Sequence, residues 1–333
     1  MRKIILLFTV LLISGNLIAQ PEFTDLSSKV GAFSRMGFGA RGIGMGNAMS
    51  SVITGNLVSY YNPALSPFQE NNSFQTGYSF LSLDRSLNFL SFTRKFDFYS
   101  SKDSSEDRKP VSTAGISAGI INAGVGSIDG RDGGGLHTKD LSTSENQFFL
   151  SVSNRFSKKL SLGVTIKFFY YKLYEEITSG GVGLDIGALY KFNDYWNVSL
   201  VFSDINSKYQ WDTRPVYDQQ GLALTDNFSL LKKIGVSYYN PEIKLLAAVE
   251  FESSNARSSI IRAGAEYNIY ENLFLRAGVD QLNLRNFDFG VKPAFGFSYS
   301  KMFDGVMIGV DYAFMIEQYS PSDRHIVGVN LQF

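Results

Sequence analysis

The side chains that could perform acid–base or nucleophilic chemistry are few. Only His137 and His325 titrate near neutral pH, and the chain of 333 residues has no cysteine. Thiolate catalysis, disulfides and thiolate metal sites are therefore excluded. No serine lies in a nucleophile-elbow motif. We expect a protein that is not an enzyme, and the alternative is a hydrolase site built in a barrel from residues distant in sequence.

One acidic, glycine-rich segment could bind a cation. Asp129 and Asp132 lie in the segment 129–137, which contains four glycines and ends at His137. Their spacing does not match the ligand pattern of an EF-hand. A mobile glycine-rich loop outside the membrane is the favoured interpretation over a Ca²⁺ site, and we expect no metal.

A second glycine-rich segment, Gly37-Phe38-Gly39-Ala40-Arg41-Gly42, matches the pattern GxGxxG. A dinucleotide site also requires a preceding buried strand, a following helix and an acidic residue about twenty positions later. None of these is evident in the sequence. We interpret the match as chance and expect no cofactor. With 31 basic and 31 acidic side chains, no global charge favours nucleic acid either.

The elements that would position these residues are strands. The last seven residues, 327–333, alternate between apolar and polar and end on an aromatic side chain. An open terminal strand must be paired, and in lipid this requires closure of the whole sheet. Val329, Leu331 and Phe333 resemble the C-terminal signal read by the bacterial barrel-assembly machinery. The alternative is a soluble sandwich that ends in a strand.

The start of the chain indicates export. Residues 1–19 have a cationic start at Arg2 and Lys3, an apolar run over 4–13, and a candidate cleavage point at Ala19-Gln20. The run is too short to span a bilayer as a helix, and no later segment of about 20 apolar residues exists. We therefore predict a signal peptide and a location in the outer membrane, in contact with its lipid.

Segments of alternating polarity recur along the rest of the chain, separated by turn residues. They predict an all-β transmembrane antiparallel barrel of about fourteen strands. The predicted strands are 72–83, 86–96, 111–124, 145–156, 160–174, 178–192, 195–204, 232–239, 242–252, 258–269, 272–281, 286–299, 305–318 and 324–333.

Connection lengths support this count, because outer-membrane barrels have short periplasmic turns and longer external loops. From residue 156 onward short and long connections alternate, and the longest loop is 205–231. The segment 97–110 is the exception, since it is long but falls on the short-turn side. Either the second strand is misplaced, or this segment is a periplasmic contact site.

The alternation also assigns the two faces of each strand. Val306, Ile308, Val310, Tyr312, Phe314 and Ile316 are expected to face lipid, whereas Gly309, Asp311, Ala313 and Glu317 face the lumen. In 272–281, Leu273, Leu275, Ala277 and Val279 face outward, and Arg276, Gly278 and Asp280 face inward. Other charged side chains expected inside are Lys167, Asp185, Lys191, Glu250, Arg262, Glu266, Asp288 and Lys292. Their signs are mixed, which favours mutual pairing in a packed lumen over a selectivity device.

Aromatic residues and one proline mark particular places in the wall. Aromatic side chains near the tight turns predict an interfacial girdle. They are Tyr190, Phe192, Tyr195, Trp196, Tyr238, Tyr267, Tyr270, Phe297 and Tyr299. Pro293 interrupts the strand 286–299 and predicts a bulge or kink, or alternatively a lateral opening toward lipid.

Two motifs in the N-terminal part suggest a family. Arg41, Gly42, Gly44, Met45 and Gly46 lie in Arg-Gly-x-Gly-Met-Gly-x-Ala, and Asn62, Pro63 and Ala64 follow two tyrosines. This pair resembles the start of the PorV/PorQ family, relatives of the outer-membrane long-chain fatty acid transporter. The resemblance implies a plug over 20–70 and a fourteen-stranded barrel over 71–333. We expect Asn62-Pro63 to form a turn before the first strand. The family usually has an aromatic such as Trp before Asn-Pro-Ala, and here it is Tyr61.

The same resemblance implies a function linked to type IX protein secretion or surface attachment. Partners would then be secreted proteins with C-terminal sorting domains, or other secretion components. The candidate contact residues lie in 205–231 and are Tyr209, Trp211, Arg214 and Tyr217. The alternative is a transporter for hydrophobic, fatty acid-like small molecules, which would have an apolar pocket behind the plug.

Overall fold

A computed structural model describes residues 24–99, 110–217, 220–288 and 290–333. In this part of the chain, fourteen strands close into one antiparallel barrel, and β8 and β9 pair separately. The expected all-β, fourteen-strand barrel is therefore confirmed. The predicted signal peptide lies outside the described residues. None of the described helices is long and apolar enough to cross a membrane.

The wall strands follow one another around the barrel, except that β7 pairs with β10. Their bounds are β1 (Ser73–Phe80), β2 (Arg85–Phe98), β3 (Ser112–Arg131), β4 (His137–Arg155), β5 (Leu160–Lys172), β6 (Thr178–Lys191), β7 (Trp196–Ile205), β10 (Leu231–Asn240), β11 (Leu245–Ser254), β12 (Ser259–Tyr270), β13 (Leu273–Asn283), β14 (Lys292–Phe303), β15 (Val306–Met315) and β16 (Arg324–Gln332).

Closure joins the two ends of the sheet. β16 pairs with β1 from Gln332↔Ser73 to His325↔Phe80, and also with β15. Phe333 and Asn72 exchange two backbone hydrogen bonds of 3.0 and 3.1 Å. No edge of the barrel wall remains open, which is the condition for a sheet in lipid.

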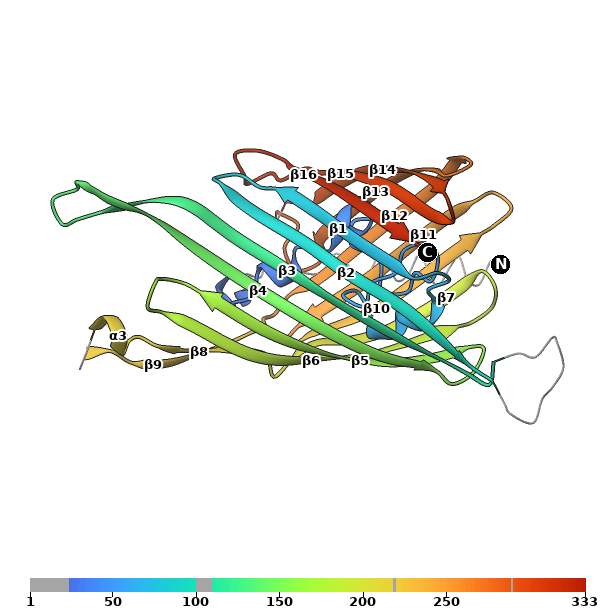
Figure 1. Cartoon of the computed structure of the whole chain (residues 1–333), viewed down its shortest axis with the longest axis horizontal. Helices are drawn as coiled ribbons and strands as arrows, with labels where there is room; N and C mark the ends of the chain where they lie inside the picture. Colours follow the sequence, from blue (N-terminus) through green and yellow to red (C-terminus); the bar gives the residue numbers. More distant parts are fainter. Residues whose placement is uncertain (1–23, 100–109, 218–219, 289) are drawn as a thin grey trace.

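The barrel has two unlike ends, visible in Figure 1. The short-turn end carries the connections 156–159, 192–195, 241–244, 271–272 and 304–305. At the opposite, long-hairpin end, β3 and β4 project well past the wall (Figure 1). The tip of this hairpin occupies only 132–136, so much of the predicted glycine-rich loop is strand. Asp129 contacts both Arg131 and His137 there, at 2.6 and 2.7 Å.

Besides the longer β3 and β4, two predicted segments are wrong in their bounds. The segment 205–231 contains the hairpin of β8 (Lys208–Asp212) and β9 (Ala223–Asn227), with α3 (Arg214–Tyr217) between them, and is not a simple loop. β14 starts at Lys292 and not at 286, so Asp288 lies exposed outside the wall and does not face inward.

Pro293 therefore does not interrupt a strand. It is the second residue of β14, where a missing N–H is tolerated, and its carbonyl accepts a hydrogen bond of 2.9 Å from the Ile316 N–H. The ladder from Asp280↔Lys292 to Leu273↔Tyr299 has no register shift. The expected bulge at Pro293 is therefore absent from this ladder, and a lateral opening toward lipid stays a prediction.

The second predicted strand is real. β2 pairs with β3 along its whole length, from Arg85↔Val125 to Phe98↔Ser112. The long connection predicted over 97–110 is thus a true exception at the short-turn end, although β2 continues to Phe98 and the connection runs from 99 to 111. Most of it, 100–109, lies outside the described residues, so a contact role for it stays a prediction.

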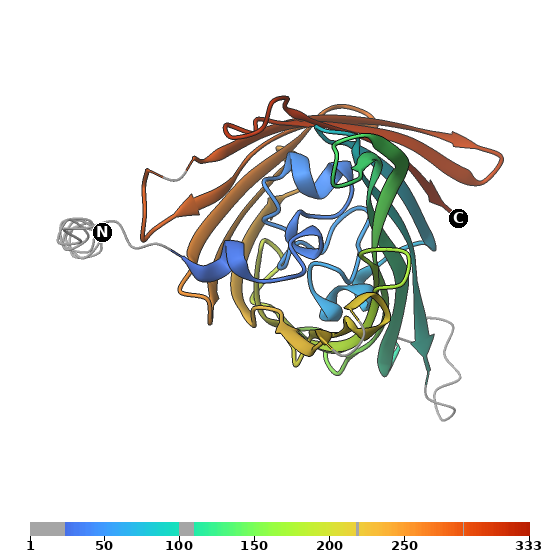
Figure 2. The same ribbon diagram turned by 90° about the vertical axis from the view of Figure 1, so that its left-hand side faces the viewer.

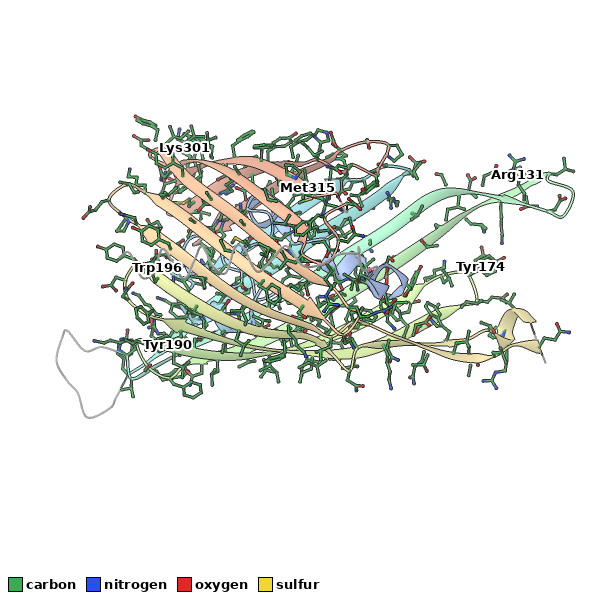
Figure 3. The ribbon with its side chains drawn as sticks, turned by 180° about the vertical axis from the view of Figure 1, so that it is seen from behind. Arg131, Tyr174, Tyr190, Trp196, Lys301 and Met315 are labelled. Atoms are coloured by element: carbon green, nitrogen blue, oxygen red, sulfur yellow. The ribbon has the colours of Figure 1, made fainter. Side chains whose placement is uncertain are left out.

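The two faces of the wall are as predicted, because side chains in a strand alternate with period two. Val310 is 50 % exposed on the outer face, whereas Gly309 and Asp311 on either side of it face the lumen and are buried. The aromatic residues at the short-turn end point outward, among them Tyr190 and Trp196 (Figure 3). An apolar outer surface with an aromatic girdle is typical of a barrel in lipid.

The N-terminal segment fills the lumen (Figure 2). Thr24 lies at the long-hairpin end, where its hydroxyl donates a hydrogen bond of 2.9 Å to the Ala256 carbonyl. The chain then passes through η2 (Asp25–Ser28), η3 (Phe33–Arg35), α2 (Gly39–Gly44) and η4 (Pro63–Phe68) before β1 begins at the short-turn end. We call residues 24–72 the plug.

Candidate functional site: the plug and two lumen cavities

The glycine motif begins within α2 and continues past its C-terminal cap, Met45, and α2 lies against the lumen face of β13 to β16. Small residues of neighbouring strands meet it. A Cβ at Gly264 would lie 2.7 Å from the Met45 carbonyl carbon, and one at Gly278 would lie 2.9 Å from the Gly46 Cα. Both distances are shorter than van der Waals contact. Glycine in the wall and in the plug is therefore required by close backbone packing.

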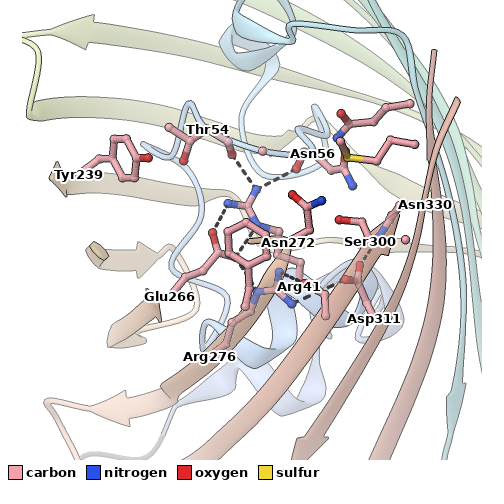
Figure 4. Close-up of a pocket in the computed structure, with 16 residues that line it drawn as sticks. Arg41, Thr54, Asn56, Tyr239, Glu266, Asn272, Arg276, Ser300, Asp311 and Asn330 are labelled. Carbon is pink, nitrogen blue, oxygen red and sulfur yellow. Dashed lines mark hydrogen bonds and ion pairs between the residues drawn. The ribbon is translucent and has the colours of Figure 1, made fainter. Parts of the chain in front are cut away.

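Arg41 anchors α2 to the wall (Figure 4). Its Nε and Nη2 donate to the two carboxylate oxygens of Glu266 at 2.9 and 2.8 Å. Its Nη1 donates to the carbonyl oxygens of Thr54 and Asn56 at 2.7 and 3.1 Å. Glu266 also accepts a bond of 2.6 Å from Arg276. This buried, bidentate pair fixes both the position and the direction of the helix.

Tyr61 ties the two motifs together. Its hydroxyl oxygen accepts a hydrogen bond of 2.9 Å from the Phe38 N–H and lies 2.9 Å from Asn47 Oδ1. Asn47 Nδ2 in turn donates to Asp280 of β13 at 2.8 Å. An indole N–H could not accept the bond from Phe38, so Tyr in place of Trp has a physical role here.

Asn62 starts η4 and does not form the expected simple turn. Its Oδ1 caps the helix by accepting a bond of 2.9 Å from the Ala64 N–H, and Pro63 takes the first helical position. The Ala64 carbonyl accepts a bond of 2.9 Å from Ser161 of β5. A Cβ at Gly163 would lie 2.5 Å from the Pro63 carbonyl carbon. η4 is thus fastened to the half of the wall opposite α2.

Two cavities lie on either side of this plug. The outer cavity, about 430 Å³, opens at the long-hairpin end. It is lined by η2, η3 and the parts of β12 to β16 nearest that end. The inner cavity, about 260 Å³, lies toward the short-turn end beside Arg41 and is lined by polar residues that include Asn272, Ser300 and Asp311 (Figure 4). Both share the wall of β12 to β16, and α2 lies between them.

The charged residues of the lumen mostly pair, as predicted. Lys167 lies 2.8 Å from Asp185 and 2.9 Å from Asp204. Arg262 contacts Glu252 at 2.9 Å and Asp280 at 2.7 Å, with a longer contact to Glu250. Lys191, like Asp288, does not face inward, and it pairs with exposed Asp194 at the short-turn end.

The predicted partner-contact residues are placed differently from one another. Tyr209 and Trp211 are only 0 % and 9 % exposed, so the expectation that they lie exposed on a loop is wrong. They pack against Tyr171 and Phe169, and the Tyr209 hydroxyl donates to Glu145 at 2.9 Å. Arg214 is exposed and contacts Asp212 at 2.6 Å, and Tyr217 ends α3.

The remaining predicted residues lie on the surface. Val329, Leu331 and Phe333 belong to the closing strand, where Phe333 stacks against Phe92 with ring centroids 6.5 Å apart. His325 lies on the outer face, and its Nδ1 is 2.7 Å from the Tyr312 hydroxyl.

Among the described residues, no group of three or more His, Asp or Glu could hold a metal ion. The GxGxxG match forms part of the plug, and no described strand precedes it.

The prediction did not single out Arg324, which lies in the wall of the outer cavity. It is 2 % exposed, its Nε donates to Ser79 at 2.6 Å and its Nη1 donates to the Met36 carbonyl at 2.7 Å. The alternation of 324–333 places it on the lumen face with Gly328 and Asn330. This alternation was the signal in the sequence that could have placed Arg324 in the lumen.

Solved structures share this architecture. The toluene transporter TodX of Pseudomonas putida aligns with a TM-score of 0.54 and 15 % identity, over 89 % of this chain and 96 % of that one. A FadL homologue of Pseudomonas aeruginosa aligns with a TM-score of 0.52 and 10 % identity, over 89 % and 98 %. The fold of this chain is that of the TodX and FadL-type outer-membrane barrels. No protein-family model and no curated protein sequence matches the chain.

Proposed function

We propose that this protein is an outer-membrane channel for small molecules with an apolar part, and that the plug controls passage. The observation that carries this proposal is the pair of cavities on one side of the lumen, separated by α2. The outer cavity has the size of a small-molecule site. The likeness to TodX, described as a toluene transporter, supports a channel role at the level of the fold.

The geometry suggests how passage would occur. A solute entering the outer cavity meets the end of α2, where the backbone of Met45 and Gly46 lies against Gly264 and Gly278 of the wall without room for a Cβ. Movement of α2 by a few ångströms away from β12 to β16 would join the two cavities. No bond-making chemistry is required, so we propose a passive channel and not an enzyme.

A disulfide lock tests this proposal. A Cβ at Gly328 of β16 would lie 4.0 Å from the Cβ of Ala40 in α2, which is within the range for a disulfide. Because the chain has no cysteine, Ala40→Cys with Gly328→Cys creates a unique pair. In cells of a Gram-negative host, uptake of the apolar dye N-phenyl-1-naphthylamine is the readout.

We expect dye uptake to be several-fold slower in the oxidised double variant and to recover after reduction. Each single cysteine variant is the matched control and should not respond to the reductant. If the disulfide forms on a gel but uptake is the same before and after reduction, α2 does not control passage.

A second candidate function is the receipt of secreted proteins, as in type IX secretion. The two motifs resemble the PorV/PorQ family, and the β3–β4 and β8–β9 hairpins project from the same end (Figure 1). Leu136 and Leu222 on these hairpins are 71 % and 63 % exposed. Crosslinkers there, and not at buried Tyr209 or Trp211, should capture a protein with a C-terminal sorting domain if this function holds.

A further inference from the structure

The inner cavity is lined mostly by polar residues, and the charges among them balance. Its cationic side chains are Arg41 and Arg276, and its carboxylates are Glu266 and Asp311. Its other polar side chains are neutral amides and hydroxyls. Because equal numbers of opposite charges favour neither an anion nor a cation, this lining suits a neutral polar solute.

This cavity belongs to the short-turn end of the barrel. Asn272 lies in the connection 271–272, and Gln332 is the last residue of β16. Gly55 of the plug also lines the cavity and is exposed to solvent. Since α2 lies between the two cavities, a solute at the short-turn end reaches the inner one without movement of the plug. The short-turn end is the periplasmic end of outer-membrane barrels.

One pair of charged side chains in this cavity is incompletely satisfied (Figure 4). Arg276 donates to Glu266 through Nε at 2.6 Å and to Ser298 through Nη2 at 2.7 Å. Its Nη1 is buried and has no hydrogen-bond partner among the described residues. Asp311 Oδ1 lies 3.7 Å from this Nη1, which is too long for a hydrogen bond, and Asn330 donates to the other carboxylate oxygen, Oδ2. A donor and an acceptor therefore lie side by side without a bond between them.

A hydroxyl group satisfies this pair, whereas a charged group does not. A hydroxyl oxygen about 2.8 Å from both atoms would accept a hydrogen bond from Arg276 Nη1 and donate one to Asp311 Oδ1. A carboxylate cannot donate and is repelled by Asp311, and an ammonium group cannot accept and is repelled by Arg276. A buried charged donor without a partner is unfavourable, so the pair favours a ligand hydroxyl.

Further uncommitted polar groups continue from this pair along the cavity. Ser298 lies opposite Asp311 in the ladder, and Ser300 follows two residues later, where its backbone N–H donates to the Asn272 carbonyl at 3.2 Å. The side chains of Ser300 and Asn272 line the cavity and make no hydrogen bond to another residue of the described chain. The same holds for the hydroxyl of Tyr239 across the cavity (Figure 4). One water would satisfy only the pair, whereas a molecule with several hydroxyls would also reach these groups.

The size of the cavity limits the ligand to a small molecule. Its volume of about 260 Å³ corresponds to roughly nine water molecules at about 30 Å³ each. This is room for a polyol of four or five carbons.

We infer that the inner cavity binds a small neutral polyol, with one hydroxyl between Arg276 and Asp311 and others at Ser300 and Asn272. The site goes beyond the proposed channel, because it lies at the periplasmic end and needs no movement of α2. Its selectivity comes from hydroxyl groups and not from an apolar body. Arg41 and Glu266, which also line the cavity, remain paired with each other at 2.8 Å and keep the plug in place.

Three probes test which chemistry the cavity takes. Xylitol is a neutral five-carbon polyol, and xylarate has the same chain with a carboxylate at each end. Diglyme is neutral and of similar size, but it accepts hydrogen bonds and cannot donate them. Saturation-transfer-difference NMR on the purified full-length barrel in detergent measures their dissociation constants, with empty micelles as the blank.

We expect xylitol to bind about tenfold or more tightly than either of the other probes. Xylarate brings a second negative charge toward Asp311, and diglyme leaves the Asp311 oxygen without a donor. Xylarate or diglyme binding as tightly as xylitol would overturn the inference, and so would the absence of saturable xylitol binding.

Variants then locate the site. Ser300→Ala and Asn272→Ala each remove an uncommitted side-chain group, so both should fold, and each should weaken xylitol binding several-fold. Asp311→Asn should narrow the gap between xylitol and xylarate, because the like charge is gone. Ser320→Ala is the matched control, since Ser320 is a half-buried serine that lines the outer cavity instead. If Asp311→Asn does not fold, the two alanine variants carry the test.

The outcome is separate from that of the disulfide lock. If Ser300→Ala and Asn272→Ala bind xylitol as tightly as Ser320→Ala does, the polyol does not occupy this cavity and the inference fails, whatever the lock shows. If the lock has no effect on dye uptake but xylitol binding depends on Ser300 and Asn272, the polyol site stands and the gating role of α2 fails.

Discussion

Replacing Gly264 of the wall by alanine should weaken the packing of the plug against the wall while the barrel stays closed. In Gly264→Ala, the new Cβ would lie 2.7 Å from the Met45 carbonyl carbon, whereas ordinary contact begins at 3.4 Å. The Met45 carbonyl oxygen would lie closer still, so the two backbones must separate by at least about 0.7 Å. The wall cannot yield easily, because Gly264 is held in register between Ala248 and Gly278 of its neighbouring strands. The plug must move instead.

The size of the effect follows from the anchors that the shift strains. The Arg41–Glu266 hydrogen bond of 2.8 Å would lengthen to about 3.5 Å, beyond normal geometry. Overpacking of this kind costs about 1–3 kcal/mol. If this free energy is lost from the docked state of the plug, the population ratio of docked to undocked plug falls by about 5- to 150-fold.

The assay is dye uptake in cells, together with limited proteolysis of the plug in the purified protein. We expect faster uptake and faster cleavage, while the barrel keeps its heat-modifiable migration on a gel. Gly309→Ala is the matched control, since it also faces the lumen but its new Cβ would meet only wall atoms, with Ser300 Cβ at 3.3 Å as the nearest. Equal uptake and cleavage for the two variants would refute the reasoning.

Three other predictions concern the barrel wall and the β8–β9 hairpin. Deletion of Val327–Phe333 should abolish insertion into the outer membrane, because most of β16 would be missing between β15 and β1. A heat-modifiable band from the truncated protein on a gel would contradict this. Val310→Arg should lower the unfolding free energy in lipid by about 2–4 kcal/mol and Gly309→Ser by much less, and equal values would mean that the faces are reversed. Tyr209→Ala should cost about 3–5 kcal/mol, because it removes a buried ring and leaves Glu145 without its hydroxyl partner. A neutral result in denaturant titration would mean that the hairpin does not pack into the barrel mouth.

The sequence alone determined the wall of this protein. A strand in lipid must alternate, so the identity of each residue reports its face, and Val310, Gly309 and Arg276 lie where their parity requires. The turns and the closing strand followed from the same local pattern. The exceptions, Asp288, Pro293 and Lys191, occur where a strand begins or ends, since alternation cannot say whether the terminal residues pair with a neighbour.

Only the tertiary structure decided what fills the barrel. The plug motifs could be recognised, but the contact of Met45 with Gly264, or of Arg41 with Glu266, joins residues more than 200 positions apart and depends on how the barrel closes. Tyr209 and Trp211 have the composition of an exposed interface and are nevertheless buried, because β8 lies beside β6 and their rings pack against Phe169 and Tyr171. The incomplete pairing of Arg276 depends on tertiary packing too, since parity places it in the lumen but only the folded chain shows that its Nη1 has no hydrogen-bond partner among the described residues.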